Sequence, residues 1–284
     1  GFKKVYVCAT KNTLNKIEDR SWLVKYNNHY FEKGTITRFF WQIFFLKKFL
    51  SKCNCDLLFI PGGTYFGNWK PFVTMSQNLL PFEWNELKKF GFSKMLFKML
   101  ILNFTQTYTF NKANGIIFLT RYSQGVVKNI INTSIDCTIV PHGINKRFEN
   151  KPKEQFSINN YSASNPFKIL YISSIDVYKH QDQVIEAVSV LHKEGLPVRL
   201  DLVGPAHPKK LNKIKILMEK VDPQKEFIFY HGTLPYESLD RKYKKSDLFL
   251  FASSCETFGQ IVTEAMSDRK STRLNSSHAN ISYA

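Results

Sequence analysis

The sequence predicts an α/β protein with two units, each built on a parallel sheet that helices cover on both faces. Short apolar segments alternate with stretches of helical periodicity along most of the chain, which is the pattern of repeated strand–helix–strand units. The strand candidates are apolar at consecutive rather than alternate positions, as strands buried on both faces are. A length of 284 residues suits about two domains.

The first unit is predicted over residues 1–150. Strands are expected at residues 5–8, 56–61, 71–75, 115–120 and 137–140. Helices are expected at residues 35–51 and 84–111, and a third is expected to start at Ser123, whose hydroxyl suits an N-cap. A tight turn at Gly62-Gly63 follows the second strand.

The polar residues 151–166 are expected to link the units, and residues 167–267 to form the second one. Strands are expected at residues 167–172, 198–204, 227–230 and 248–252. Helices are expected at residues 182–193, 209–220 and 236–244, and a last helix is expected to open near Phe258.

The strand–helix rhythm stops at Ser267. Residues 268–278 resemble the translated start of a common sequencing adapter, and residues 281–284 resemble its continuation. We therefore expect residues 268–284 to be an artefactual tail outside the fold. We also expect the second unit to be truncated there, and the first strand of the first unit to be missing.

Composition excludes several classes of protein. A hydrophobic content of 43% with 22% charged residues is typical of a folded chain rather than a disordered one. The longest apolar stretch, residues 39–50, is interrupted by polar residues and is shorter than the roughly 18 residues of a membrane helix. Five scattered Cys predict reduced thiols in a cytoplasmic protein, and Cys53-x-Cys55 is too tight for the usual metal pair, so no metal is expected.

The net charge of +17 lies mostly in residues 1–150, which is consistent with a nucleic acid, with an anionic membrane surface, or only with a genome bias toward Lys, Asn, Phe and Ile. No nucleic-acid module accompanies it, so we expect no nucleic-acid partner. Residues 38–48 mix aromatic and basic side chains, which favours association with the inner face of a membrane. A buried helix with a solvated Lys edge explains the same residues equally well.

The most informative stretch is residues 253–266, where an apolar strand runs into polar residues, a glycine and a helix. In an open α/β sheet, ligands bind at the carboxyl ends of strands. Backbone amides around Phe258, Gly259 and Gln260 would face an anionic group, and Gly259 would let it approach closely. Glu256 and Glu264 would accept hydrogen bonds from hydroxyls, so the arrangement suits a sugar nucleotide.

The pattern S-x-x-E-x-F-G-x-x-x-x-E-A-M from Ser253 to Met266 resembles the Glu-x7-Glu motif of retaining GT-B glycosyltransferases of family 4, the glycosyl transferases group 1. Two Glu at this spacing would be a weak signal, whereas the whole pattern is specific. The resemblance extends over most of residues 56–267. It implies two Rossmann-like domains facing a cleft and a hexosyltransferase that uses a nucleotide-diphosphate sugar without a metal or cofactor.

The resemblance implies roles for particular donor-side residues. Glu256 would bind hydroxyls of the donor sugar and Glu264 those of the ribose. Lys179 would neutralise the diphosphate, although Ser174 stands where the family has an Arg. The loops that flank the nucleotide base would contain three residues, Gly204, His231 and Gly232, which equally suit plain turns after strands.

On the acceptor side the resemblance is looser. Gly62 and Gly63 resemble a glycine-rich acceptor turn. Asn78 ends the segment where family members often carry a His, so no His role is implied. Arg121 lies in a strand-to-helix turn that would face the cleft and contact an anionic acceptor or the donor phosphate, although a surface Arg is an equal interpretation.

The resulting hypothesis is sugar transfer to a glycan or lipid-linked acceptor in surface polysaccharide or lipopolysaccharide synthesis. One alternative is a phosphorylase or epimerase on the same fold. A second is a non-catalytic homologue that binds sugar nucleotides, which the serine at position 174 favours. A third is a nucleic-acid binder, whose signature would be salt-dependent binding.

Overall fold

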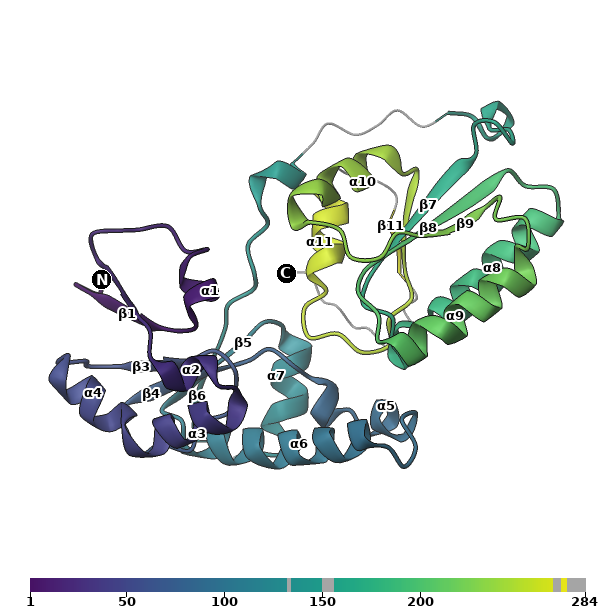
Figure 1. Ribbon diagram of the computed structural model, residues 1–284. Helices are drawn as coiled ribbons and strands as arrows, with labels where there is room; N and C mark the ends of the chain where they lie inside the picture. The colour runs from purple at the N-terminus through teal and green to yellow at the C-terminus, as the bar shows by residue number, and fades with distance from the viewer. Residues whose placement is uncertain (132–133, 150–155, 268–271, 275–284) are drawn as a thin grey trace. The chain divides into compact units, whose positions relative to one another are not determined.

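The computed structural model describes residues 1–131, 134–149, 156–267 and 272–274 (Figure 1). Its α/β architecture with parallel sheets confirms the predicted fold class. The chain forms two compact units that interleave along the sequence. The first comprises Gly1–Met75, Phe104–Ile117 and Ile131–Cys137, and the second comprises Ser76–Asn103, Phe118–Ile130 and the described residues from Thr138 onward.

The first unit contains two separate sheets. Strands β1 (Val5–Cys8) and β2 (Leu23–Tyr26) pair in parallel with each other. A four-stranded sheet has the order β3 (Leu58–Ile60), β4 (Phe72–Ser76), β5 (Gly115–Phe118) and β6 (Asp136–Ile139). Strand β2 and the helices α1 (Lys11–Leu14) and α2 (His29–Glu32) were not predicted, because four residues are too few to show a periodicity.

Two long predicted helices are each divided in the structure. Residues 35–51 form α3 (Thr35–Phe44) and α4 (Leu46–Lys52), which meet at Phe45. Residues 84–111 form α5 (Trp84–Lys88) and α6 (Lys94–Lys112). Gly91 lies between these two helices with a φ of 55°, a left-handed conformation that ends a helix.

The prediction that Ser123 caps the next helix was wrong by three residues. Helix α7 (Arg121–Lys128) is capped by Thr120, whose side chain accepts from the Ser123 amide, while the Ser123 hydroxyl completes the capping box. The two hydroxyl residues are three apart, so either could be taken for the cap in the sequence.

The second unit contains a sheet with the order β11-β10-β7-β8-β9, whose neighbouring strands all run parallel. Its strands are β7 (Phe167–Ile172), β8 (Val198–Val203), β9 (Ile228–Tyr230), β10 (Leu248–Phe251) and β11 (Thr272–Leu274). Its main helices are α8 (Gln181–Lys193), α9 (Pro208–Val221), α10 (Leu239–Lys245) and α11 (Gln260–Met266). Strand β7 has the predicted bounds, and the other strands differ from prediction by a residue or two, apart from β11.

Strand β11 lies in the predicted tail. Residues 272–274 pair in parallel with β10, although residues 268–284 were expected outside the fold. The rest of that tail, residues 268–271 and 275–284, lies outside the described residues. The adapter origin of the tail stays a prediction.

Each face of the second sheet has its own core. Ile169 and Tyr171 belong to a cluster with α8 and α9, whereas Leu170 and Ile172 belong to a cluster with α10 and α11. Successive strand residues point to opposite faces, so one apolar strand supplies both cores. Figure 1 shows these two pairs of helices on opposite sides of the strands.

The turns after β7, β8 and β9 meet at the carboxyl ends of these strands. The Gly204 amide donates to the Gly232 carbonyl (2.8 Å), and the Ile175 amide donates to the Pro205 carbonyl (2.9 Å). Gly204 has a φ of +140°, and a Cβ on it would lie 2.0 Å from the Ser173 carbonyl oxygen. The close approach of the first two turns therefore requires glycine at position 204.

Gly204→Ala is expected to destabilise the second unit by about 2 kcal/mol or more, because the methyl group meets backbone atoms and the backbone is strained. Gly125→Ala in α7 is the matched control, since its methyl group would enter open space. The control should be neutral or stabilising by about 0.5–1 kcal/mol. Urea unfolding followed by circular dichroism measures both changes, and equal midpoints for the two variants would contradict the prediction.

Candidate active site

The segment between β10 and α11 forms the centre of the candidate site. It leaves the carboxyl end of the sheet at Ala252 and enters α11 through Gly259, which caps the helix with a φ of 73°. The helix therefore begins at Gln260, two residues after the predicted opening near Phe258. Helix α11 has seven residues, so its dipole contributes little by itself.

Lys179 and Glu256 are brought together from different turns. Lys179 ends a 3₁₀ turn after β7, and its Nζ forms an ion pair with Glu256 Oε1. The two side chains are only 9% and 17% exposed. Lys179 Nζ also lies 5.0 Å from the ring centre of Tyr178 and 5.6 Å from that of Phe251. The pair places a cation and a carboxylate in contact at the end of the sheet.

Glu264 lies about one turn into α11, and this residue is only 2% exposed. Its Oε1 accepts from the Tyr236 hydroxyl (3.0 Å) and its Oε2 accepts from the Tyr243 hydroxyl (3.2 Å). Burial raises the pKa of this carboxyl, and the tyrosine hydrogen bonds offset only part of that effect. Each carboxylate oxygen has a further lone pair, so hydrogen bonding to a ribose requires no loss of the tyrosine partners.

His231 is held by a charged network under the turn after β9. Its Nε2 contacts Asp201 Oδ1, and Arg199 donates to the same carboxylate through Nε (3.1 Å) and Nη2 (2.9 Å). Burial opposes ionisation of Asp201, but the bonds from Arg199 and His231 outweigh it and lower the pKa of the carboxyl. His231 thus fixes the turn that contains Gly232, whose φ is 67°.

The remaining predicted donor-side residues have different surroundings. Ser174 is exposed, and its carbonyl accepts from Gln181 Nε2 (2.9 Å). The Phe258 ring meets the His142 ring edge-on, with centroids 5.4 Å apart. Gln260 Nε2 donates to the Gly143 carbonyl (3.3 Å). Phe258 and Gln260 therefore pack on the segment that follows β6.

Two predicted acceptor-side residues lie beside the Glu256 turn. Asn78 precedes Leu79, whose amide donates to Thr257 Oγ1 (3.0 Å). Arg121 is exposed and follows Thr120, whose hydroxyl donates to the Thr257 carbonyl (3.1 Å). The second unit thus places both residues next to the turn that contains Glu256.

Gly62 and Gly63 belong to the first unit. Gly63 has a φ of +68°, and a Cβ on it would lie 3.2 Å from Gln106 Nε2. This left-handed backbone makes the predicted tight turn. Their predicted contact with an acceptor stays a prediction.

Sequence reasoning missed a polar cluster around Ser254. The Ser254 hydroxyl donates to Glu86 Oε2 (2.7 Å) and lies 2.9 Å from His180 Nε2. Glu86 is buried and forms an ion pair with Lys89 (2.8 Å). In the sequence, Glu86 and Lys89 lie in the helix predicted over residues 84–111, and no local pattern indicates that they meet Ser254.

The two buried carboxylates should respond oppositely to neutralising substitutions. Because the folded pKa of Glu264 is raised, its ionisation costs stability as the pH rises above the unfolded value of 4.5. Glu264→Gln should therefore increase the free energy of unfolding near pH 7 by about 1 kcal/mol or less, which raises the thermal midpoint. Near pH 4 it should change the stability little. Circular dichroism melting measures the midpoints.

Asp201→Asn is the matched comparison. The folded pKa of Asp201 is lowered, so its charge stabilises the fold above the unfolded value of 3.8, and this stability is lost as the pH falls through the folded pKa. The substitution should cost about 1.5–3 kcal/mol near pH 7 and less at acidic pH. Equal destabilisation by both substitutions near pH 7 would contradict the assignment.

Comparison with known proteins adds an independent observation. The model of the family described as glycosyl transferases group 1 matches residues 152–270. A search of curated protein sequences found no significant match.

Several solved structures are similar. Staphylococcus aureus TarM, in complex with fondaparinux, α-GlcNAc-glycerol and UDP, is 19% identical with a TM-score of 0.53, covering 75% of this chain and 38% of that one. Anabaena HepE with UDP and glucose is 15% identical with a TM-score of 0.58, and the match covers 88% of this chain and 66% of HepE. Sucrose-phosphate synthase from Thermosynechococcus elongatus is 16% identical with a TM-score of 0.60, and the match covers 80% of this chain and 58% of the synthase.

At these identities the likeness shows the fold alone, and this chain spans only part of each neighbour. The family match covers both members of the Lys179–Glu256 pair, which the structure brings into contact. The chain therefore has the GT-B fold, and its residues 152–270 are similar to the glycosyl transferases group 1 family.

Proposed function

We propose that this protein is a retaining hexosyltransferase that moves a sugar from a nucleotide-diphosphate donor to a glycan or lipid-linked acceptor. The observation that carries the proposal is the contact between Lys179 and Glu256 at the carboxyl end of the second sheet. The family match over residues 152–270 supports it. Cell-surface polysaccharide or lipopolysaccharide synthesis is the process we assign to it, by analogy with the family.

In this proposal the two side chains act on neighbouring parts of the donor. Lys179 binds the diphosphate and stabilises the negative charge that develops as the bond to the sugar breaks. Glu256 accepts hydrogen bonds from sugar hydroxyls and orients the ring. No residue serves as general base, because the departing phosphate oxygen assists the acceptor hydroxyl. Since Ser174 offers no positive charge, Lys179 provides most of this neutralisation.

A uridine diphosphate sugar is the first donor to test. TarM and HepE were each solved with UDP, and one HepE structure contains UDP-glucose. The turns at Gly204 and Gly232 provide backbone groups beside the end of the sheet, where a base would be recognised. Glu264 would bind the ribose.

A non-catalytic homologue that binds sugar nucleotides is the second candidate. The specific observation in its favour is Ser174, at the position where the resemblance implies an Arg. A non-catalytic homologue would bind the donor without releasing the nucleoside diphosphate. A phosphorylase or epimerase would be recognised because it turns over its substrate without transferring a sugar from a sugar nucleotide to an acceptor.

We also propose that the protein associates with the cytoplasmic surface of a membrane. Residues 38–48 of α3 and α4 include Arg38, Lys47 and Lys48 and no acidic residue. Along this segment Phe40 is 49% exposed and Phe44 is 65% exposed. Exposed aromatic and basic side chains on one short segment suit an anionic lipid surface. None of the helices in the described ranges is long and apolar enough to cross a membrane.

Glu256→Gln and Lys179→Gln should each weaken binding of the donor by about 10- to 100-fold, because each removes a charge-assisted hydrogen bond of about 1.5–3 kcal/mol. Isothermal titration calorimetry with UDP-glucose, with GDP-mannose as the comparison base, measures this. Lys215→Ala, an exposed residue of α9, is the control and should bind as the parent does. If neither donor binds the parent chain, or if the control loses affinity equally, the donor-site assignment is wrong.

Replacing Phe40 and Phe44 together by Ser should reduce binding to vesicles that contain phosphatidylglycerol by at least about 10-fold, because two exposed aromatic anchors are lost. Co-sedimentation measures it, with pure phosphatidylcholine vesicles as the uncharged comparison. Ile216→Ser is the control, since this α9 side chain is 57% exposed outside the proposed surface. An equal effect of the control, or no preference for the anionic lipid, would refute the assignment.

A further inference from the structure

Two tyrosines and an arginine from other segments lie around the carboxyl group of Glu264. The Tyr236 hydroxyl donates to Oε1 (3.0 Å), and the Tyr243 hydroxyl donates to Oε2 (3.2 Å). The guanidinium carbon of Arg147 lies over the ring of Tyr236, 4.1 Å from its centre. A guanidinium at this distance packs on the aromatic face and is attracted by it. Arg147 therefore restricts the tyrosine that holds one oxygen of Glu264.

A short 3₁₀ turn, Lys146–Phe148, supplies this arginine. Phe148 is only 1% exposed, and its ring meets those of Tyr236 and Tyr243 edge-on, with both centroid separations 5.6 Å. Its carbonyl accepts from the Ser267 hydroxyl at the end of α11 (2.6 Å). The turn is therefore anchored on α10 and α11, and this anchoring fixes the backbone of the arginine.

Arg147 also brings a positive charge toward Glu264. Burial raises the pKa of the carboxyl, and hydrogen bonds from Tyr236, Tyr243 and Gln260 oppose this effect. The charge of Arg147 also lowers the pKa, although the pKa stays raised in total. Hydroxyl groups bind more strongly to an ionised carboxylate than to a neutral acid, because the hydrogen bond is then charge-assisted. Arg147 thus widens the pH range in which Glu264 binds hydroxyls strongly.

We propose that Arg147 and Tyr236 are positioning residues, which hold the Glu264 carboxylate in the orientation that accepts hydrogen bonds from the ribose of the donor. The inference rests on the proposed function, in which Glu264 binds the ribose. Both residues act through Glu264 and not through the diphosphate or the base. A defect in either should therefore weaken binding only of nucleotides that have ribose hydroxyls.

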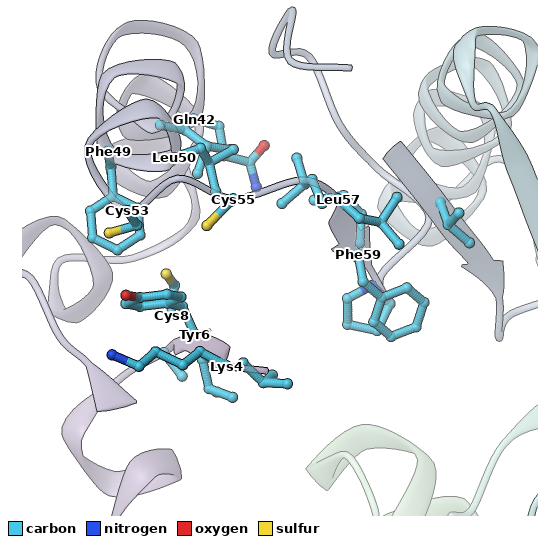
Figure 2. A pocket seen from close by; sticks show the side chains of 18 of the residues that line it. Lys4, Tyr6, Cys8, Gln42, Phe49, Leu50, Cys53, Cys55, Leu57 and Phe59 are labelled. Carbon is cyan, nitrogen blue, oxygen red and sulfur yellow. The ribbon is translucent and has the colours of Figure 1, made fainter. Parts of the chain in front are cut away.

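A large cavity of the first unit is a competing place for a nucleotide to bind. Its volume is about 1540 Å³, and strands β1 and β3 line it together with the segments that adjoin them. Figure 2 shows Lys4 and Cys8 on one side of it and Phe59 on the other. The cavity belongs to the first unit, whereas Glu264 belongs to the second. Lys4 offers a positive charge to a diphosphate there, so Lys4→Gln tests this alternative.

The test compares UDP and GDP with their 2′,3′-dideoxy analogues, which lack both ribose hydroxyls. Isothermal titration calorimetry on the full chain measures the dissociation constants. For the base that binds more tightly, the parent should prefer the ribose form by at least about 10-fold, because the analogue loses a charge-assisted hydrogen bond. Tyr236→Phe and Arg147→Met should each reduce this preference by at least about 3-fold. Both variants should bind the dideoxy analogue as the parent does, which also shows that they are folded.

Tyr161→Phe is the matched control for Tyr236→Phe. It removes a hydroxyl that donates to Asp247 Oδ1 (3.3 Å), another buried carboxylate of the second unit. This variant and Lys4→Gln should bind all the nucleotides as the parent does. Arg147→Lys keeps the positive charge and should restore most of the preference that Arg147→Met loses.

The pH dependence of the preference is a second readout. The preference should be present above the folded pKa of Glu264 and be lost as the pH falls through it, because the carboxyl then becomes neutral. Arg147→Met removes a charge that lowers this pKa, so the preference should be lost at a higher pH than in the parent. A residue with only a structural role would not move this pH.

An unchanged preference in both Tyr236→Phe and Arg147→Met, with the nucleotide still bound by the parent, would overturn this inference alone. Equal weakening of the ribose and dideoxy forms would do the same, and so would an equal effect of Lys4→Gln. If the parent binds both forms equally, Glu264 does not bind the ribose, and the inference fails together with that assignment. If the parent binds none of the nucleotides, the proposed function itself is wrong.

Discussion

The candidate site of this protein depends on the buried ion pair between Lys179 and Glu256. It joins the turn after β7 to the turn after β10, two strands that are neighbours in the sheet but far apart in the sequence. Removing one partner of such a pair costs about 3–5 kcal/mol, because the other charge stays buried. The Tyr171 hydroxyl donates to the Lys179 carbonyl, so the core under β7 also positions the cation. Stability and the proposed donor recognition thus share the same residues.

Buried carboxylates in the second unit differ according to their partners. Asp201 faces Arg199, His231 and Lys242, which favour its charged form. Glu264 faces two tyrosine hydroxyls that donate hydrogen bonds, and the positive charge of Arg147 offsets its burial only in part, so its pKa stays raised. Asp201 therefore acts as a fixed anion under the turn of Gly232. Glu264 is held in a single orientation at the expense of stability, which is common for groups that bind a ligand.

Polar contacts join the Glu256 turn to segments that precede the predicted linker. Thr257 bonds to Leu79 and Thr120, and Ser254 bonds to Glu86. These contacts explain why residues 76–103 and 118–130 group with the second unit. Each predicted acceptor residue in these segments is thereby adjacent to the donor turn, although the predicted boundary at residue 150 stays a prediction.

The sequence by itself determined the alternation of strands and helices, the fold class and the motif that contains Glu256 and Glu264, because apolar periodicity and local spacing are written in consecutive residues. Strand β7 illustrates this, since six consecutive apolar or amphipathic residues define both its bounds and its two buried faces. The tertiary structure alone decided that Lys179 meets Glu256, that Glu264 is enclosed by Tyr236 and Tyr243, and that Gly204 abuts Ser173. It also divided the two long helices and left the edges of β1 and β3 facing one cavity. The reason is physical: burial, pairing and close approach depend on residues far apart in the chain, and no local pattern encodes them.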